Sequence, residues 1–351
     1  MNAGIEFRQV SKRYGDARSP LVVQGIDLVV PRGTLTTILG PSGCGKTTTL
    51  RMIAGLEAPT AGTIFIDGQD VTTLGPAERN VSMVFQSYAL FPHMNVIDNV
   101  GYGLMVTGVG REERARRARE AMALVGLAGY EQRLPSELSG GQQQRVAVAR
   151  SLVLEPSVLL FDEPLSNLDA RLRRSMREEI RALQQRLKLT VAYVTHDQSE
   201  ALAVSDQIIV MDAGRIAQAG SPRELYEAPA SEFVAGFMGE AMLFDAEVLA
   251  DGLVQLGPLR WQPGRVLAPG VVKLAVRPEA WRVEAMSDSA AGHHLPGRLA
   301  KRAYLGGSLE LTFETALGEI FVVSPAVEQG WQVGDELALT LAGRGVSVLG
   351  R

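Results

Sequence analysis

The sequence LTTILGPSGCGKTTTL at residues 35–50 joins an apolar run, a glycine-rich turn and a helix-compatible segment. Its turn fits the pattern G-x-x-x-x-G-K-[ST], in which backbone N–H groups and a helix N-terminus surround phosphate oxygens. A purely structural tight turn is the alternative, and the strand-like and helix-like flanks disfavour it. The residues predicted to hold the phosphates of a nucleotide are Gly40, Pro41, Ser42, Gly43, Cys44, Gly45, Lys46, Thr47 and Thr48.

Two adjacent carboxylates, Asp162 and Glu163, directly follow a second apolar run at residues 158–161. Ligands of open α/β sheets bind at the carboxyl ends of such strands. We therefore expect Asp162 to hold Mg²⁺ together with the hydroxyl of Thr47, and Glu163 to act as general base toward the attacking water. Lys46 is expected to reach the β- and γ-phosphates. A charged pair ending an ordinary surface strand is the alternative, and the phosphate-binding turn disfavours it.

The order of apolar runs and amphipathic segments predicts an α/β domain over residues 1–237, with an inserted helical region at about residues 87–157. Apolar residues recur every three or four positions between residues 171 and 188, which predicts a helix, and a further helix is predicted over residues 111–127. The core strands expected from the apolar runs are residues 34–39, 158–161, 190–194 and 207–211.

The sequence changes character after residue 237. Short strand-like pieces alternate with turn pairs such as Gly257-Pro258, Pro269-Gly270 and Gly306-Gly307. This spacing predicts a small β-barrel domain, similar to an oligonucleotide-binding fold, over residues 238–351.

Composition excludes several classes of protein. The chain has 351 residues, 46% of them hydrophobic, enough for about two domains with ordinary cores. Its 35 basic and 39 acidic residues give a net charge of −4, which argues against a nucleic-acid partner. Because it has one cysteine, it forms no internal disulfide. The N-terminus lacks the profile of a signal peptide, and polar residues interrupt the longest uncharged run, residues 80–97, so we expect no membrane span.

The sequence LSGGQ at residues 138–142 resembles the signature of ATP-binding-cassette (ABC) ATPases. A serine hydroxyl and two glycines opening a helix form a second anion-binding helix end. The resemblance implies that these residues complete the ATP site of a second copy of the chain, so that a homodimer holds two ATP molecules. The signature residues assigned to nucleotide binding are Ser139, Gly140, Gly141 and Gln142.

Weaker signals match the same family in order along the chain. Tyr14 corresponds to the aromatic residue that stacks on adenine, and Gln86 to the glutamine that contacts the metal and the attacking water. His196 corresponds to the histidine that contacts the γ-phosphate, and residues 166–169 to a loop at the dimer interface. The resemblance thus implies that Lys46, Gln86, Glu163 and His196 are catalytic and that Thr47, Gln86 and Asp162 bind Mg²⁺.

The C-terminal part resembles that of importer ATPases. The resemblance rests on the joining segment 233–239 and on the sequence AVRPE at residues 275–279. The resemblance implies an ATPase that energises a membrane importer, with ferric iron or polyamine as the favoured cargo and phosphonate or sugar as further candidates. Its partners would be transmembrane permease subunits and, indirectly, a periplasmic solute-binding protein. The chain would then lie peripherally at the cytoplasmic face of the inner membrane.

Other readings stay open at this point. A soluble ABC ATPase acting on nucleic acid or the ribosome is disfavoured because the motifs occur once and no sustained heptad pattern separates residues 86 and 138. Residues 87–94 are aromatic and apolar, and the resemblance implies that they help to dock a permease; ordinary core packing is the alternative. The helix N-terminus and Lys46 would both favour the thiolate of Cys44, but the favoured interpretation is a small residue that fills space in the turn.

Overall fold

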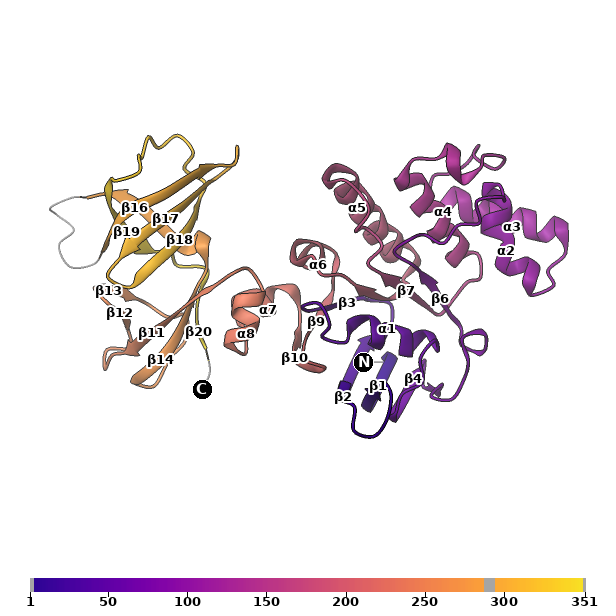
Figure 1. Cartoon of the computed structure of the whole chain (residues 1–351), viewed down its shortest axis with the longest axis horizontal. Coiled ribbons are helices and arrows are strands. Elements are labelled where there is room, and N and C mark those ends of the chain that lie inside the picture. Colours follow the sequence, from indigo (N-terminus) through magenta and orange to yellow (C-terminus); the bar gives the residue numbers. More distant parts are fainter. Residues whose placement is uncertain (1–2, 287–293, 350–351) are drawn as a thin grey trace. The chain divides into compact units, whose positions relative to one another are not determined.

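The structure is a computed structural model that describes residues 3–286 and 294–349 (Figure 1). It divides into two compact units, with the division between Pro222 and Arg223. Within the described ranges, no helix combines the length and the apolar character needed to span a membrane.

A six-stranded sheet with the strand order β10-β9-β3-β8-β7-β6 forms the centre of the first unit. Five of its strands run parallel, and only β10 is antiparallel to its neighbour β9. The four core strands expected from the sequence all belong to this sheet, and the α/β prediction is confirmed. The strands are β3 (Leu35–Leu39), β6 (Val81–Val84), β7 (Val158–Asp162), β8 (Thr190–Val194), β9 (Gln207–Asp212) and β10 (Arg215–Gly220).

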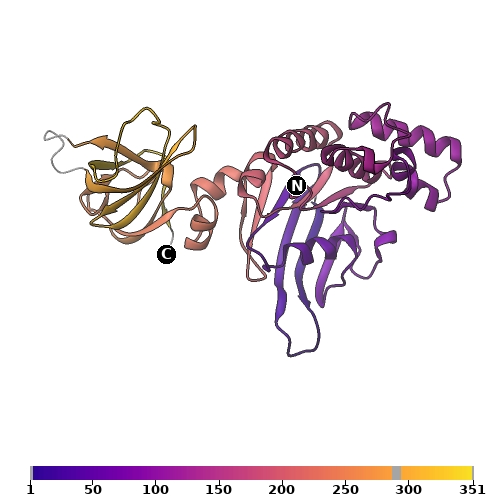
Figure 2. The same ribbon diagram turned by 45° about the horizontal axis from the view of Figure 1, so that its top comes forward.

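Both faces of this sheet are covered, which explains why its strands are continuous apolar runs. In β7, Val158 and Leu160 face helix α1 and an antiparallel sheet of order β2-β1-β4-β5, whereas Leu159 and Phe161 face helices α4 and α5 (Figure 2). The elements of the first of these two layers are β1 (Ala3–Arg13), β2 (Leu21–Pro31), α1 (Lys46–Ala54), β4 (Ala61–Ile66), β5 (Gln69–Asp70) and the 3₁₀ turn η1 (Pro76–Glu78).

Helices fill the inserted region, as predicted, and flank the other face of the sheet. The helix predicted to reach residue 127 ends at Leu124, because Gly126 adopts a left-handed conformation (φ 70°) that stops it. Asp169 caps the long helix α5 by accepting the N–H of Leu172 at 2.9 Å. The helical elements are α2 (Val96–Val106), α3 (Arg111–Leu124), η2 (Pro135–Glu137), α4 (Gly140–Leu152), α5 (Ala170–Leu187) and α6 (Gln198–Val204).

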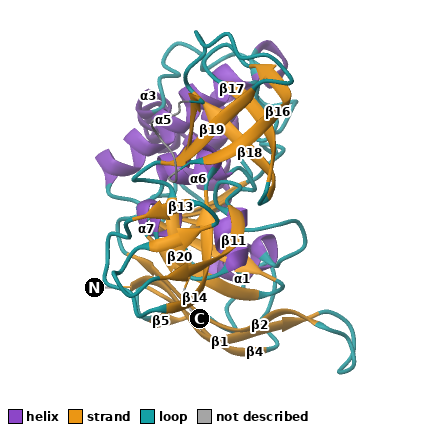
Figure 3. Cartoon of the chain, turned by 90° about the vertical axis from the view of Figure 1, so that its left-hand side faces the viewer, coloured by secondary structure: helices purple, strands orange, loops and turns teal. Residues whose placement is uncertain are grey.

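The second unit is dominated by two five-stranded sheets packed around one apolar core (Figures 1 and 3). The strand orders are β13-β12-β11-β14-β20 and β15-β19-β16-β17-β18, all antiparallel. This arrangement confirms the predicted all-β second domain. Its strands are β11 (Met242–Val248), β12 (Val254–Leu256), β13 (Leu259–Trp261), β14 (Gly270–Val276), β15 (Trp281–Ala285), β16 (Leu295–Tyr304), β17 (Leu309–Thr315), β18 (Gly318–Ser324), β19 (Glu336–Leu341) and β20 (Val346–Leu349).

Two short helices, α7 (Pro222–Glu227) and α8 (Glu232–Phe237), precede the first strand of this unit. The division at residue 222 therefore falls earlier than the boundary expected at residue 237. The reason is Arg277, just before the 3₁₀ turn η3 (Pro278–Ala280). This residue is 2% exposed, and its guanidinium donates to the carbonyl oxygens of Tyr226 and Met238 and lies 3.6 Å from the centroid of the Tyr226 ring. Arg277 thus ties the two helices to the β-strands.

Candidate functional site

The predicted site residues gather at one edge of the six-stranded sheet. Parallel strands end at the same edge, so the segments after β3, β6, β7 and β8 emerge side by side. The phosphate-binding turn follows β3 and Gln86 follows β6. The carboxylates of Asp162 and Glu163 lie at the end of β7, and His196 follows β8. Topology alone therefore places the phosphate-binding, metal-binding and catalytic candidates together.

The turn at residues 40–47 folds tightly around the buried ammonium of Lys46. Its Nζ donates to the carbonyl oxygens of Gly40 at 2.7 Å and Pro41 at 2.9 Å. Gly45 caps α1 with φ 103°, and a Cβ at Gly40 would lie 2.3 Å from the carbonyl oxygen of Met211. Side chains are therefore excluded where the backbone must curl, and Lys46 is held ready for anionic oxygens.

Thr47 and Asp162 present two oxygen ligands toward each other. The Thr47 hydroxyl lies 3.5 Å from Oδ1 of Asp162. Burial raises the pKa of Asp162, against the opposing charge of Arg51. A poorly solvated carboxylate beside a hydroxyl suits a hard divalent cation such as Mg²⁺, which prefers oxygen ligands and would stabilise the ionised form. The residues present therefore fit the expected metal.

Glu163 and His196 are in direct contact. Nδ1 of His196 lies 3.1 Å from Oε2 of Glu163. The backbone N–H of Glu163 donates to the carbonyl oxygen of Val194 at 3.0 Å, and Glu163 adopts a left-handed conformation with φ 45°. The chain thus turns sharply after β7 and aims the carboxylate at the histidine. An exposed imidazole orienting a carboxylate is an arrangement suited to activating water.

Gln86 joins the same group through its backbone. Its carbonyl oxygen accepts a 2.9 Å hydrogen bond from Nδ2 of Asn167, and its side chain is exposed. The hydrogen bond by which Asn167 holds the backbone of this segment was not predicted from the sequence. The only available signal was the polar loop at residues 166–169 that directly follows the carboxylates.

The signature residues lie at the N-terminus of α4 and interact mainly with their own neighbours. Ser139 and Gln142 cap the helix reciprocally: Oε1 of Gln142 accepts the Ser139 N–H at 3.0 Å, and Oγ of Ser139 accepts the Gln142 N–H at 3.4 Å. A Cβ on Gly141 would lie 2.8 Å from a methyl group of Leu172 on α5. This helix end is thus an exposed anion-binding feature, separate from the phosphate-binding turn of its own chain.

Tyr14 is exposed in the loop between β1 and β2. The residue is 43% exposed, and the ammonium of Lys12 lies 4.8 Å from the centroid of its ring. An exposed aromatic face of this kind is available to stack on a nucleobase.

The comparisons agree with this geometry. Residues 23–166 match the family model of the ABC transporter, and residues 274–349 match that of the TOBE domain. A Rhizobium meliloti protein named Fe(3+) ions import ATP-binding protein FbpC 1 is 57% identical over 98% of this chain and 97% of its own length.

The chain belongs to the ABC transporter family. The solved structure of the cassette MJ0796, dimeric in a post-hydrolysis state with ADP and Pi, is 31% identical, covers 62% of this chain and 99% of its own, and has a TM-score of 0.56. The cbiO1 protein of Clostridium perfringens is 27% identical, covers 65% of this chain and 92% of its own, and has a TM-score of 0.60. The ABC cassette with a C-terminal β domain is therefore confirmed, and the chain is an ATPase coupled to transport.

The favoured interpretation of Cys44 as a small filler residue agrees with the structure of this ABC ATPase. The side chain is 3% exposed, and burial raises the pKa of the Cys44 thiol despite the opposing charge of Lys46. Lys46 and the backbone hydrogen bonds near the thiol lower its pKa by less than burial raises it. Cys44 is a small packed residue in the turn.

Cys44 should react with iodoacetamide at pH 7 at least about tenfold more slowly than the same thiol in the guanidinium-unfolded chain, because the folded thiol is buried and protonated. The rate should rise with pH above neutrality, since ionisation is then favoured. Mass-spectrometric alkylation time courses measure both, and ATP should slow the reaction further. Equal rates in the folded and unfolded chains would contradict the packing of Cys44.

The segment expected to dock a permease is only partly exposed. Within residues 87–94, Tyr88 is 7% exposed, whereas Pro92 and His93 are exposed. The Phe91 and Tyr102 rings pack at 4.4 Å between centroids, and Arg150 donates to the carbonyl oxygens of Tyr88 and Ala89. Core packing thus accounts for part of the segment.

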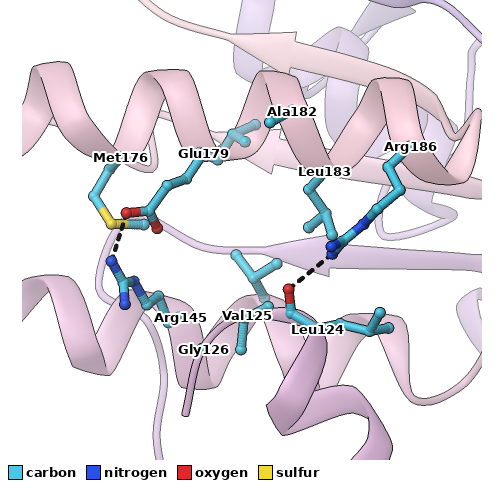
Figure 4. A pocket seen from close by; sticks show the side chains of 11 residues that line it. Leu124, Val125, Gly126, Arg145, Met176, Glu179, Ala182, Leu183 and Arg186 are labelled. Atoms are coloured by element: carbon cyan, nitrogen blue, oxygen red, sulfur yellow. Dashed lines mark hydrogen bonds and ion pairs between the residues drawn. The ribbon is translucent and has the colours of Figure 1, made fainter.

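A cavity of about 340 Å³ lies between α5 on one side and α4 with the end of α3 and residues 125–126 on the other (Figure 4). Apolar side chains such as Val125, Met176 and Leu183 line it. A 2.5 Å ion pair between Arg145 and Glu179 and a 2.9 Å hydrogen bond from Arg186 to the carbonyl oxygen of Leu124 span the cavity. None of the predicted nucleotide-site residues lines this cavity, so it separates the helical region from α5 rather than forming part of the site.

Proposed function

We propose that this chain is the ATP-hydrolysing subunit of a membrane importer for ferric iron. The observation that supports ferric iron as the cargo is the 57% identity, over 98% of the chain, to a protein named for Fe(3+) import. Polyamine, phosphonate and sugar are the competing cargoes, and an ATPase acting on nucleic acid or the ribosome is not favoured. The chain would work peripherally at the cytoplasmic face of the inner membrane, against permease subunits that receive substrate from a periplasmic binding protein.

The site would perform hydrolysis mainly by positioning and charge neutralisation. Thr47, Asp162 and Gln86 would hold Mg²⁺, which supplies positive charge beside the phosphate oxygens when bound. Lys46 would exchange its carbonyl partners for the β- and γ-phosphate oxygens. Glu163, oriented by His196, would take a proton from water as the water oxygen bonds to the γ-phosphorus and the bond to the ADP oxygen breaks.

A homodimer would complete each site. The exposed cap at Ser139 and the N–H groups of Gly140 and Gly141 would meet the γ-phosphate bound by the partner subunit, with Gln142 fixing the cap. Tyr14 would stack on the adenine. Support comes from the dimeric cassette with ADP and Pi, which is 31% identical to this chain. The exposed part of residues 87–94 forms the surface that we propose contacts the permease.

Deletion of the gene encoding this chain should abolish ATP-dependent uptake of radioactive ferric iron, and the wild-type chain should restore it. The Glu163→Gln chain should not, because uptake needs hydrolysis. Cellular accumulation of ⁵⁵Fe, measured beside labelled spermidine, separates the cargoes. Loss of spermidine uptake with iron uptake unchanged would replace iron by polyamine as the cargo.

A further inference from the structure

Arg173 lies near the start of α5 and its guanidinium reaches two separate loops. Nη2 donates to the carbonyl oxygen of Leu168 at 3.0 Å, in the loop that follows the catalytic carboxylates. Nη1 lies 3.6 Å from Oδ2 of Asp197, the residue after His196. One side chain therefore bridges the segment after β7 and the segment after β8.

Each of these loops is also tied to a candidate catalytic residue. In the first loop, the Ser166 hydroxyl donates to the carbonyl oxygen of Glu163 at 3.0 Å, and Asn167 holds the carbonyl oxygen of Gln86. Displacement of this loop would therefore move the backbone of both residues.

Asp197 divides its two carboxylate oxygens between two tasks. Oδ1 accepts the N–H of Glu200 at 3.0 Å and so caps α6, whereas Oδ2 faces Arg173. The turn that carries His196 is thus fixed on one side by its own helix and on the other by the guanidinium.

We propose that Arg173 is a positioning residue for ATP hydrolysis: it holds the loop at residues 166–169 and the turn bearing His196 at a fixed spacing, and so sets the contact between Glu163 and His196. This inference rests on the proposed function, because it presumes that those two residues act on water. The competing view is that Arg173 makes only a partly exposed ion pair, which would contribute little.

The chemistry of the bridge favours arginine. A guanidinium carries donors that point in two directions from one plane, whereas an ammonium is a single point charge. Lysine at this position would keep the charge and most of the aliphatic stem but could serve only one of the two loops. Lysine is therefore a test of bridging rather than of charge or packing.

The full-length chain carrying Arg173→Lys or Arg173→Gln should hydrolyse ATP with kcat lowered about tenfold and with KM within about twofold of wild type, because misplacement of catalytic groups acts on the chemical step. Arg174→Gln is the matched control. Arg174 is the next residue on α5, its side chain is 77% exposed, and it pairs with Glu178 at 3.3 Å. Steady-state ATPase kinetics and thermal unfolding are measured on all three variants.

Asp197→Asn is an independent test of the bridge. The amide oxygen of the asparagine can still cap α6, while the negative charge facing Arg173 is lost. We expect it to lower kcat in the same direction, and the double variant Arg173→Gln/Asp197→Asn to be no slower than Arg173→Gln alone, since both remove one connection. If Arg173→Gln fails to fold, the lysine and asparagine variants decide the question.

Wild-type kcat in Arg173→Lys, or multiplicative effects in the double variant, would overturn the proposal. His196→Ala separates this failure from that of the proposed function. If His196→Ala abolishes hydrolysis while the Arg173 variants do not change it, only the bridge is wrong. If His196→Ala leaves hydrolysis unchanged, the catalytic assignment itself is wrong.

Discussion

Glu163→Gln should lower the kcat of ATP hydrolysis by roughly 10²- to 10⁴-fold, the range associated with loss of a general base, while ATP binding is retained. Glutamine preserves the size of the side chain and a contact with His196, which lies 3.1 Å from the carboxylate. It cannot accept the proton of the attacking water. Because bound ATP is then not consumed, the chain should accumulate as an ATP-bound dimer, measured by light scattering after gel filtration.

Glu178→Gln is the appropriate control for this variant. Glu178 is an exposed carboxylate on α5 that pairs with Arg174, so its neutralisation changes the net charge equally but should leave turnover at the wild-type level. Near-wild-type hydrolysis by Glu163→Gln would remove Glu163 from the mechanism. Slow hydrolysis without an ATP-dependent dimer would instead contradict the proposed shared site.

Lys46→Ala should weaken ATP binding at least about 100-fold, since two charge-assisted hydrogen bonds at roughly 1.5–3 kcal/mol each would be lost. Lys46 is 6% exposed, and its ammonium already lies among the carbonyl oxygens of the turn. Isothermal titration with a non-hydrolysable ATP analogue measures the affinity.

Lys301→Ala removes the same charge from an exposed position on β16 and should bind the analogue as the wild type does. Thermal unfolding of both variants shows whether Lys46→Ala keeps its fold. Unchanged affinity in a folded Lys46→Ala chain would contradict the assignment of residues 40–48 as the phosphate-binding segment.

Much of the first unit could be predicted because strong local patterns define it. The strands β3, β7, β8 and β9 are mostly apolar and are buried on both faces, as a fully covered parallel sheet requires. The glycine-rich turn and the two carboxylates then fall at one sheet edge by topology. Their proximity follows without knowledge of any side-chain contact.

Features that depend on packing between distant segments could not be predicted. The raised pKa of Cys44 reflects burial, and the need for a glycine at position 141 reflects the approach of Leu172. Nothing in the local sequence of either position reports these neighbours. The bridge made by Arg173 was also missed, because an arginine early in a helix is ordinarily a solvated residue.

The buried guanidinium of Arg277 has a practical consequence for anyone dissecting this ATPase. An excised cassette ending at residue 237 would retain α7 and α8 but lose the side chain that saturates the Tyr226 carbonyl and stacks on its ring. Without these contacts, we expect α7 and α8 to lose helical structure and to expose apolar surface on an otherwise folded fragment. Cutting the chain just before Arg223 would leave each of the two compact units with its own hydrophobic core intact.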